Sequence, residues 1–135
     1  MVGIAVTAIM GVALYSGIGV AFSQLRLSRE NLRATQILEG KMEIVRQYNW
    51  DQVANTPGFV PTTFSEPFFA DNPTNGVSNF TYTGTVTVTN APITESYSND
   101  LKMVKIKITW KSGGIVHNRQ TITFVSQYGL QRYVY

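Results

Sequence analysis

Few side chains in this chain have the types and the spacing that catalysis or metal binding requires. His117 is the only histidine and cysteine is absent, so the sequence offers no histidine pair, Cys–His pair or thiolate metal site. Asp51, Glu66 and Asp71 are scattered through turn-rich sequence, without the spacing of a calcium-binding loop. Neither a glycine-rich phosphate loop nor a G-x-S-x-G elbow is present. We therefore predict no enzyme, no metal and no cofactor, and interpret His117 as a surface side chain.

Two polar features remain. Lys105, Lys107 and Lys111 are separated by two and four residues in a predicted strand, and even-numbered separations place side chains on one face of a strand. They could touch DNA or an acidic polymer, but a solvated strand face that resists edge pairing accounts for them more simply. Nucleic acid is therefore not an expected partner, in keeping with a modest excess of 11 basic over 8 acidic residues. The sequon at 79–81 (Asn-Phe-Thr) is a glycosylation signal only where the host has the enzymes to use it.

The strongest signal is at the start of the chain, where residues 1–23 contain no charged side chain. A helix of about 20 apolar residues is long enough to span a bilayer. An amphipathic pattern follows without a break, so we predict one helix over residues 1–50, about 70 Å long at ~1.5 Å per residue. Residues 1–23 form its transmembrane or filament-core half and 24–50 its amphipathic half. No Lys or Arg precedes the apolar run, so we do not expect removal as a signal peptide.

The amphipathic half has two apolar faces. One stripe at helical spacing consists of Leu27, Ala34, Ile37, Leu38, Ile44, Val45 and Tyr48. A helix packed on one sheet needs only this stripe, yet Leu25 and Leu32 lie nearly opposite it. The second face predicts a second partner, which we interpret as another copy of the chain.

The apolar half also needs cover from neighbouring copies once it is outside a membrane, because its side chains would otherwise face water. The residues that we predict to pack in a filament core are Ile4, Val6, Ile9, Met10, Val12, Leu14, Ile18, Val20, Phe22, Leu25 and Leu32.

Glycines divide the apolar half. Each glycine inside a helix costs up to ~1 kcal/mol relative to alanine. Gly3 and Gly11 are interpreted as sites of close helix packing. The cluster that ends in Gly19 is denser, and we predict that the helix melts here when it leaves the bilayer; its residues are Ser16, Gly17, Ile18 and Gly19.

Charged residues occupy the remaining helix surface. Glu30 has Arg26 and Arg33 within three or four positions, and Glu43 has Arg46. Pairing within the helix and pairing between subunits both explain this pattern. The basic excess around Arg29 is also compatible with a membrane surface.

The rest of the chain predicts a loop and a sheet. Residues 51–77 are punctuated by prolines and glycines, and we predict an extended loop anchored by its phenylalanines. Alternating apolar residues in 78–135 predict a three-stranded antiparallel sheet with a turn at Ser112-Gly113-Gly114. The fold class is therefore α+β, a long N-terminal helix packed on a small antiparallel sheet. The expected sheet core is Val86, Val88, Val104, Ile106, Ile108, Trp110, Ile122 and Phe124.

This order of elements resembles the type IV pilins and pseudopilins over the whole chain. The segment VGIAVTAIMGVALYSGIGVAFSQLRLSRENLRATQILEGKMEIVRQY looks like the family's N-terminal helix after its processing site. LKMVKIKITWKSGGIVHNRQTITFVSQYGL is similar to the family's sheet hairpin. The resemblance implies helices bundled in a filament core, sheets outside, and a helix that loses helicity partway along, where residues 16–19 lie. It also implies subunits waiting in the inner membrane, a prepilin peptidase and an ATP-driven pilus assembly machinery.

Two features depart from the family. Its processing site is a glycine, an apolar first residue of the mature chain and a glutamate four positions later, and Ala5 stands at the glutamate position if Met1 is that first residue. We expect natural residues upstream of Met1. The family's C-terminal disulfide is absent, which leaves Tyr128, Tyr133 and Tyr135 to hold the end by packing.

The sequence thus predicts a structural subunit that forms a homopolymer, an extracellular type IV pilus-like filament, and resides in the inner membrane before assembly. Adhesion, motility, DNA uptake and secretion are all compatible with it. One alternative is a pseudopilin or minor pilin of a type II secretion system. Another is a membrane-tethered extracytoplasmic binding module. Leu25 and Leu32 favour polymerisation, since a monomeric tether exposes them to water.

Overall fold

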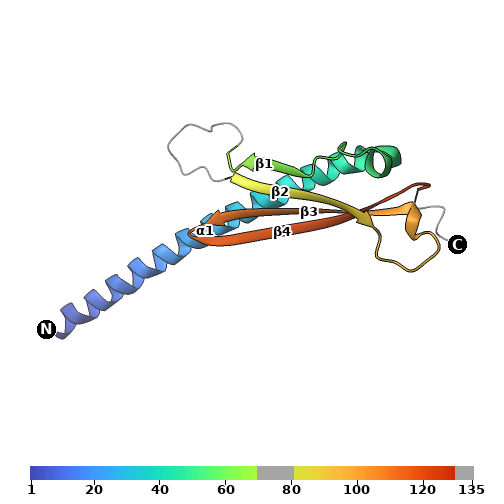
Figure 1. Ribbon diagram of the computed structural model, residues 1–135. Helices are drawn as coiled ribbons and strands as arrows, with labels where there is room; N and C mark the ends of the chain where they lie inside the picture. The colour runs from blue at the N-terminus through green and yellow to red at the C-terminus, as the bar shows by residue number, and fades with distance from the viewer. Residues whose placement is uncertain (70–80, 130–135) are drawn as a thin grey trace. The chain divides into compact units, whose positions relative to one another are not determined.

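The computed structural model describes residues 1–69 and 81–129 and confirms the α+β fold class (Figure 1). Its strands form one antiparallel sheet of four strands in the order β1-β2-β3-β4. In chain order the elements are the helix α1 (Val2–Gln47), the π-helix η1 (Asp51–Asn55), β1 (Thr63–Pro67), β2 (Thr81–Asn90), the 3-10 turn η2 (Ser98–Asp100), β3 (Leu101–Ser112) and β4 (Ile115–Ser126).

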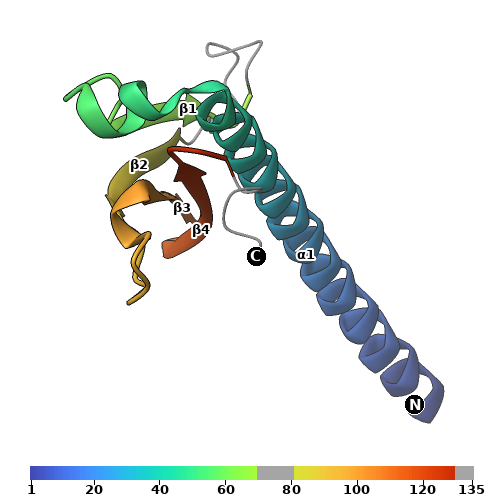
Figure 2. The same ribbon diagram turned by 90° about the vertical axis from the view of Figure 1, so that its right-hand side faces the viewer.

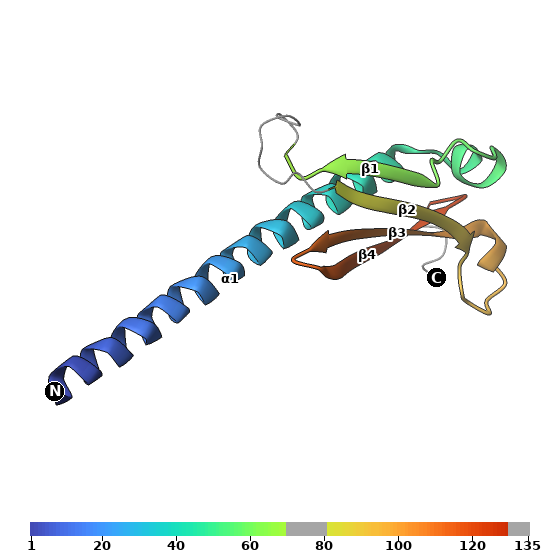
Figure 3. The same ribbon diagram turned by 60° about the vertical axis from the view of Figure 1, so that its left-hand side comes forward.

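Helix α1 is unbroken from Val2 to Gln47, as the sequence predicted (Figures 2 and 3). It ends where Asn49 and Gln52 exchange hydrogen bonds, each backbone N–H donating to the other's side-chain oxygen at 2.9 Å. The contacts within the chain define two compact units, Met1–Arg33 and the part that begins at Ala34. The first unit is helix alone, and the second contains the last part of α1 and all four strands.

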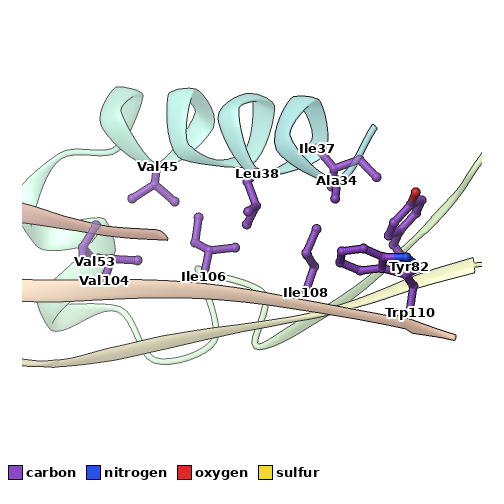
Figure 4. Packing of buried hydrophobic residues seen from close by; sticks show 10 residues of the cluster. All are labelled: Ala34, Ile37, Leu38, Val45, Val53, Tyr82, Val104, Ile106, Ile108 and Trp110. Atoms are coloured by element: carbon purple, nitrogen blue, oxygen red, sulfur yellow. The ribbon is translucent and has the colours of Figure 1, made fainter. Parts of the chain in front are cut away.

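The core of the second unit lies between α1 and β3 (Figure 4). Its helical residues recur every three or four positions and its strand residues every two, the periods that place each set on one face. The helix runs opposite to β3, with Val45 toward the Val104 end and Ala34 toward the Trp110 end. The buried residues are Ala34, Ile37, Leu38, Val45, Val53, Tyr82, Val104, Ile106, Ile108 and Trp110, and Val86 and Val88 pack against them partly buried.

Two expectations for this unit are wrong. Strand β1 lies inside the segment predicted as loop, so the sheet has four strands rather than three. Ile44 is 44% exposed, whereas Met42, two residues earlier, is buried. The phenylalanines expected as anchors do make packing contacts: Phe64 and Phe68 pack against the core, and the partly exposed rings of Phe59 and Phe69 lie edge-on to Tyr48 and Phe68, with centroids 5.1 and 4.6 Å apart. Tyr128 is 51% exposed, and Tyr133 and Tyr135 lie outside the described residues.

The prediction that Ile122 and Phe124 belong to the core is also wrong. A tight turn at Gly113 and Gly114, both with left-handed φ angles of 56° and 83°, pairs Ser112 with Ile115. This register places Ile122 opposite Lys105 and therefore on the face away from the helix. Ile122 and Phe124 are accordingly 45% and 49% exposed.

A contact between β1, β2 and the helix explains the glycine at position 84. Phe64 lies directly opposite Gly84, and a Cβ atom built on Gly84 would lie 2.0 Å from the Phe64 ring. Lys41 Nζ lies 4.8 Å from the centre of the same ring and 2.7 Å from Glu66 Oε1. The edge strand β1 is thus fastened to α1 by a cation–π contact and an ion pair, and the ring needs the space that glycine leaves.

We expect Gly84→Ala to destabilise the second unit by about 1–3 kcal/mol, because the added methyl group collides with the Phe64 ring. Urea denaturation followed by tryptophan fluorescence measures the change. Gly40→Ala is the matched control, since nothing lies within 4 Å of its added Cβ and alanine favours the helix by up to ~1 kcal/mol. Equal stability of Gly84→Ala and the parent chain would contradict the assignment.

Candidate functional site

The apolar half of α1 is exposed on every side. All residues from Met1 to Phe22 are exposed, among them every residue up to Phe22 that the sequence assigned to a filament core. By length and composition, α1 can cross a membrane, and no residue in its most apolar stretch is buried by the rest of the chain. A helix that is apolar all round is stable where lipid or other protein surrounds it. This segment is therefore the leading candidate for a functional surface.

Three of the four hydroxyl side chains in residues 1–23 donate to the helix's own backbone, and the fourth, Tyr15, is exposed. Thr7 Oγ1 donates to the carbonyl oxygen of Gly3 at 2.8 Å, and Ser16 Oγ donates to that of Ala13 at 3.0 Å. Ser23 Oγ donates likewise to the carbonyl oxygen of Val20 at 2.8 Å. An α-helix satisfies its own backbone groups except at its ends, so a segment built this way offers hydrocarbon to its surroundings with little polar cost.

A shallow hollow runs along one side of the apolar segment. Its floor consists of Ala13, Gly17 and Ala21, which recur every four residues, and Met10, Leu14 and Ile18 form its sides. Small residues at this spacing let a second helix approach closely. From the sequence, Gly17 was interpreted only as a weak point of the helix. Ala13 and Ala21 were missed, although small residues at four-residue spacing are the signal that could have identified them.

Leu25 and Leu32 are 55% and 61% exposed, as expected for a second apolar face. Charged residues along α1 make local pairs. The Arg26 Nε–H donates to Glu30 Oε1 at 3.1 Å, and Arg46 Nη1 lies 3.6 Å from Glu43 Oε2. Of the two explanations that the sequence left open, pairing within the helix is present for both pairs.

A groove separates the second half of α1 from β4 in the second unit. It has a volume of about 580 Å³. Thr121 on its strand side is a short polar residue that does not fill the space under the sheet, and Arg119 Nη1 donates to Thr35 Oγ1 at 2.8 Å across it. Glu39 and Glu43 line the helix side. The helix is therefore packed tightly on β3 and only loosely on the edge strand β4.

The outer face of the sheet carries the lysine row. Thr85 and Thr87 of β2 flank Lys107 and Lys105, and Val116 pairs with Lys111 across the other side. The lysines lie on β3, an interior strand, so the expectation that they protect a sheet edge is wrong. They do not take part in the ion pairs found within residues 1–69 and 81–129.

His117 is not the plain surface side chain that the sequence suggested. It is half-buried, and its ring stacks on Trp110 with centroids 5.5 Å apart and an interplanar angle of 25°. Within the described parts of the chain, no three His, Cys, Asp or Glu side chains are grouped so that they could hold a metal ion. Asp71 and the sequon residues Asn79 and Phe80 lie outside the described residues.

Comparisons with protein-family models, curated proteins and solved structures gave no match to this chain.

We expect the loss of the two helical ion pairs to lower the free energy of unfolding by different amounts. The Glu30 side chain is 1% exposed, whereas both members of the Glu43–Arg46 pair are about two-thirds exposed. Arg26→Ala should destabilise the protein by about 1.5–3 kcal/mol, the range for a hydrogen bond to a charged group. Arg46→Ala should change stability by no more than ~1 kcal/mol. Urea denaturation in detergent compares them, and equal effects would show that the burial of Glu30 has no energetic consequence.

Proposed function

We propose that this chain is a structural subunit that polymerises through its N-terminal helix into a type IV pilus-like extracellular filament. The single observation that carries the proposal is the apolar half of α1, exposed on every side and continuous with a helix that enters a folded sheet unit. Before assembly this segment is covered by the inner membrane, and in the filament it is covered by copies of itself.

Burial energies favour the apolar segment as the source of cohesion. Burying one large aliphatic or aromatic side chain stabilises by ~1.5–3 kcal/mol, and an exposed ion pair by ~0–1 kcal/mol. Partial cover over residues such as Ile9, Leu14 and Phe22 therefore exceeds what the surface charges can contribute. The sheet unit then supplies mainly lateral specificity and the outer surface.

Two details support polymerisation over a simple membrane tether. The hollow over Gly17 has small residues at four-residue spacing, which lets a neighbouring helix approach closely. Leu25 and Leu32 lie beyond the uncharged run and remain exposed, so a tethered monomer would leave both side chains in water. A tether needs neither feature.

We expect Leu14→Asp to abolish fibres while the sheet unit stays folded, because a carboxylate in the helix bundle would be buried without a partner. Electron microscopy of material sheared from cells scores the fibres, and tryptophan fluorescence reports the fold. Lys107→Ala is the control, since it removes one exposed charge from the outer face, and its fibres should persist.

Salt separates the two sources of cohesion, because it screens surface charges and leaves apolar burial intact. Fibres that dissociate at high salt, or that form normally with aspartate at position 14, would contradict the proposal. Absence of fibres from the parent chain under expression of its assembly system would favour the tether.

A further expectation concerns the helix inside the filament. Gly17 and Gly19 weaken the segment 16–19, and nothing lies within 4 Å of a Cβ built on either glycine. We expect the assembled helix to be interrupted here and to resume before Leu25, with neighbouring subunits or water satisfying the freed backbone groups. A filament density map tests this. An unbroken hydrogen-bond ladder from Val2 to Gln47 in that map would refute it.

A further inference from the structure

We infer that the tip of the β3–β4 hairpin of one copy seats in a pocket of mixed polarity at the opposite end of the sheet unit of the next copy. The inference rests on the proposed function and names the contact that sets the spacing between subunits.

The hairpin tip is an exposed apolar knob. Ile115 and Val116 follow the turn and are 64% and 61% exposed. Successive strand residues point to opposite faces, so the tip presents aliphatic surface on both sides. A flat surface could cover only one of the two side chains. A pocket that receives the tip end-on covers both.

Such a pocket exists in the same unit. It lies between the segment that follows α1 and the inner face of β2 and has a volume of about 240 Å³. Its lining is mixed: Thr56, Gly58 and Thr62 add polar surface to the apolar residues Val53, Ala54, Pro57, Val60, Val86 and Val88. Val88 pairs with Val104, and Figure 4 shows Val53 beside Val104. Trp110, next to the hairpin tip, is at the other end of the core in the same view. Val104 and Trp110 alone are separated by about 20 Å at ~3.4 Å per residue.

The charges at the two ends are complementary. Lys111 is exposed beside the tip, where it pairs with Val116. Asp51 is exposed at the pocket end, and its carbonyl oxygen accepts a hydrogen bond at 3.0 Å from Thr56 Oγ1, which lines the pocket. Acidic residues also precede β3 at this end, at Glu95 and Asp100, whereas the Nζ of Lys102 there donates to Asn90 Oδ1 at 2.6 Å.

A knob and a pocket at opposite ends of one unit make a head-to-tail contact. Such a contact uses two different surfaces, so it repeats without closing unless the rotation between copies forms a ring. This is the geometry of an open filament, and a second copy is therefore the occupant that the pocket and tip favour.

The chain has no cysteine, so engineered pairs report contacts without background. We would introduce Ile115→Cys and Pro57→Cys together in the full chain, purify sheared fibres and oxidise them. A disulfide requires Cα atoms within ~7 Å, which the two ends of one copy do not meet. We expect a ladder of covalent dimers, trimers and higher species on a non-reducing denaturing gel. Ile115→Cys with Thr85→Cys, an exposed position on the outer face, is the matched control and should give no ladder.

Charge variants provide the second arm. With the cysteine pair present, Lys111→Glu should lower the ladder yield severalfold, and adding Asp51→Lys should restore it. Three results would each overturn this contact without contradicting the proposed filament. They are fibres that give no ladder, a ladder equally strong in the control pair, and dimers from Ile115→Cys alone. Absence of fibres would overturn both. A ladder confined to the Ile115–Pro57 pair, with rescue by the charge swap, supports the contact.

Discussion

Burial of one face of α1 on β3 is the interaction on which the rest of the second unit depends. Leu38 and Val45 from the helix meet Ile106 and Ile108 from the strand, and none of them is more than 6% exposed. Each such side chain stabilises by ~1.5–3 kcal/mol, more than any exposed ion pair. The contact fixes the rotation of the helix and the register of the strand together. It thereby determines which residues stay outside, Glu39 on the helix and the lysine row on the sheet.

The first half of the same helix has no buried face within the chain and is exposed all round. There the backbone and the hydroxyls of Thr7, Ser16 and Ser23 are hydrogen-bonded within the helix, so the surface is hydrocarbon apart from the exposed Tyr15. A packed helix needs one apolar stripe, and a helix that moves from lipid into a protein bundle needs apolar cover all round. The change between the two patterns occurs within one uninterrupted element, because no glycine or proline breaks α1 between Phe22 and Ala34.

The sequence predicted the parts of the fold that long periodic patterns specify. The helix and the β3 face from Val104 to Trp110 were both correct, because many residues share each period. It failed where few residues decide the structure. Strand β1 is short, contains a proline and has one large hydrophobic residue, Phe64, whose partner is a glycine. In β4 both alternating faces contain apolar residues, and only the Gly113-Gly114 turn reveals that Ile122 points outward. The hairpin knob depends on this same turn, so periodicity alone could not reveal it.

Apolar burial along a helix supplies cohesion without fixing position. The hydrophobic effect is non-directional, and a bundle of helices rich in similar aliphatic side chains loses little when one slides past another by a turn. A uniform filament therefore needs a contact with shape and charge to select one register. In the filament that we propose, the sheet unit would provide that contact through its hairpin tip and its pocket. The helix would then supply cohesion and the sheet unit the register between subunits, so a substitution in the helix would change the first and a substitution in the sheet unit the second.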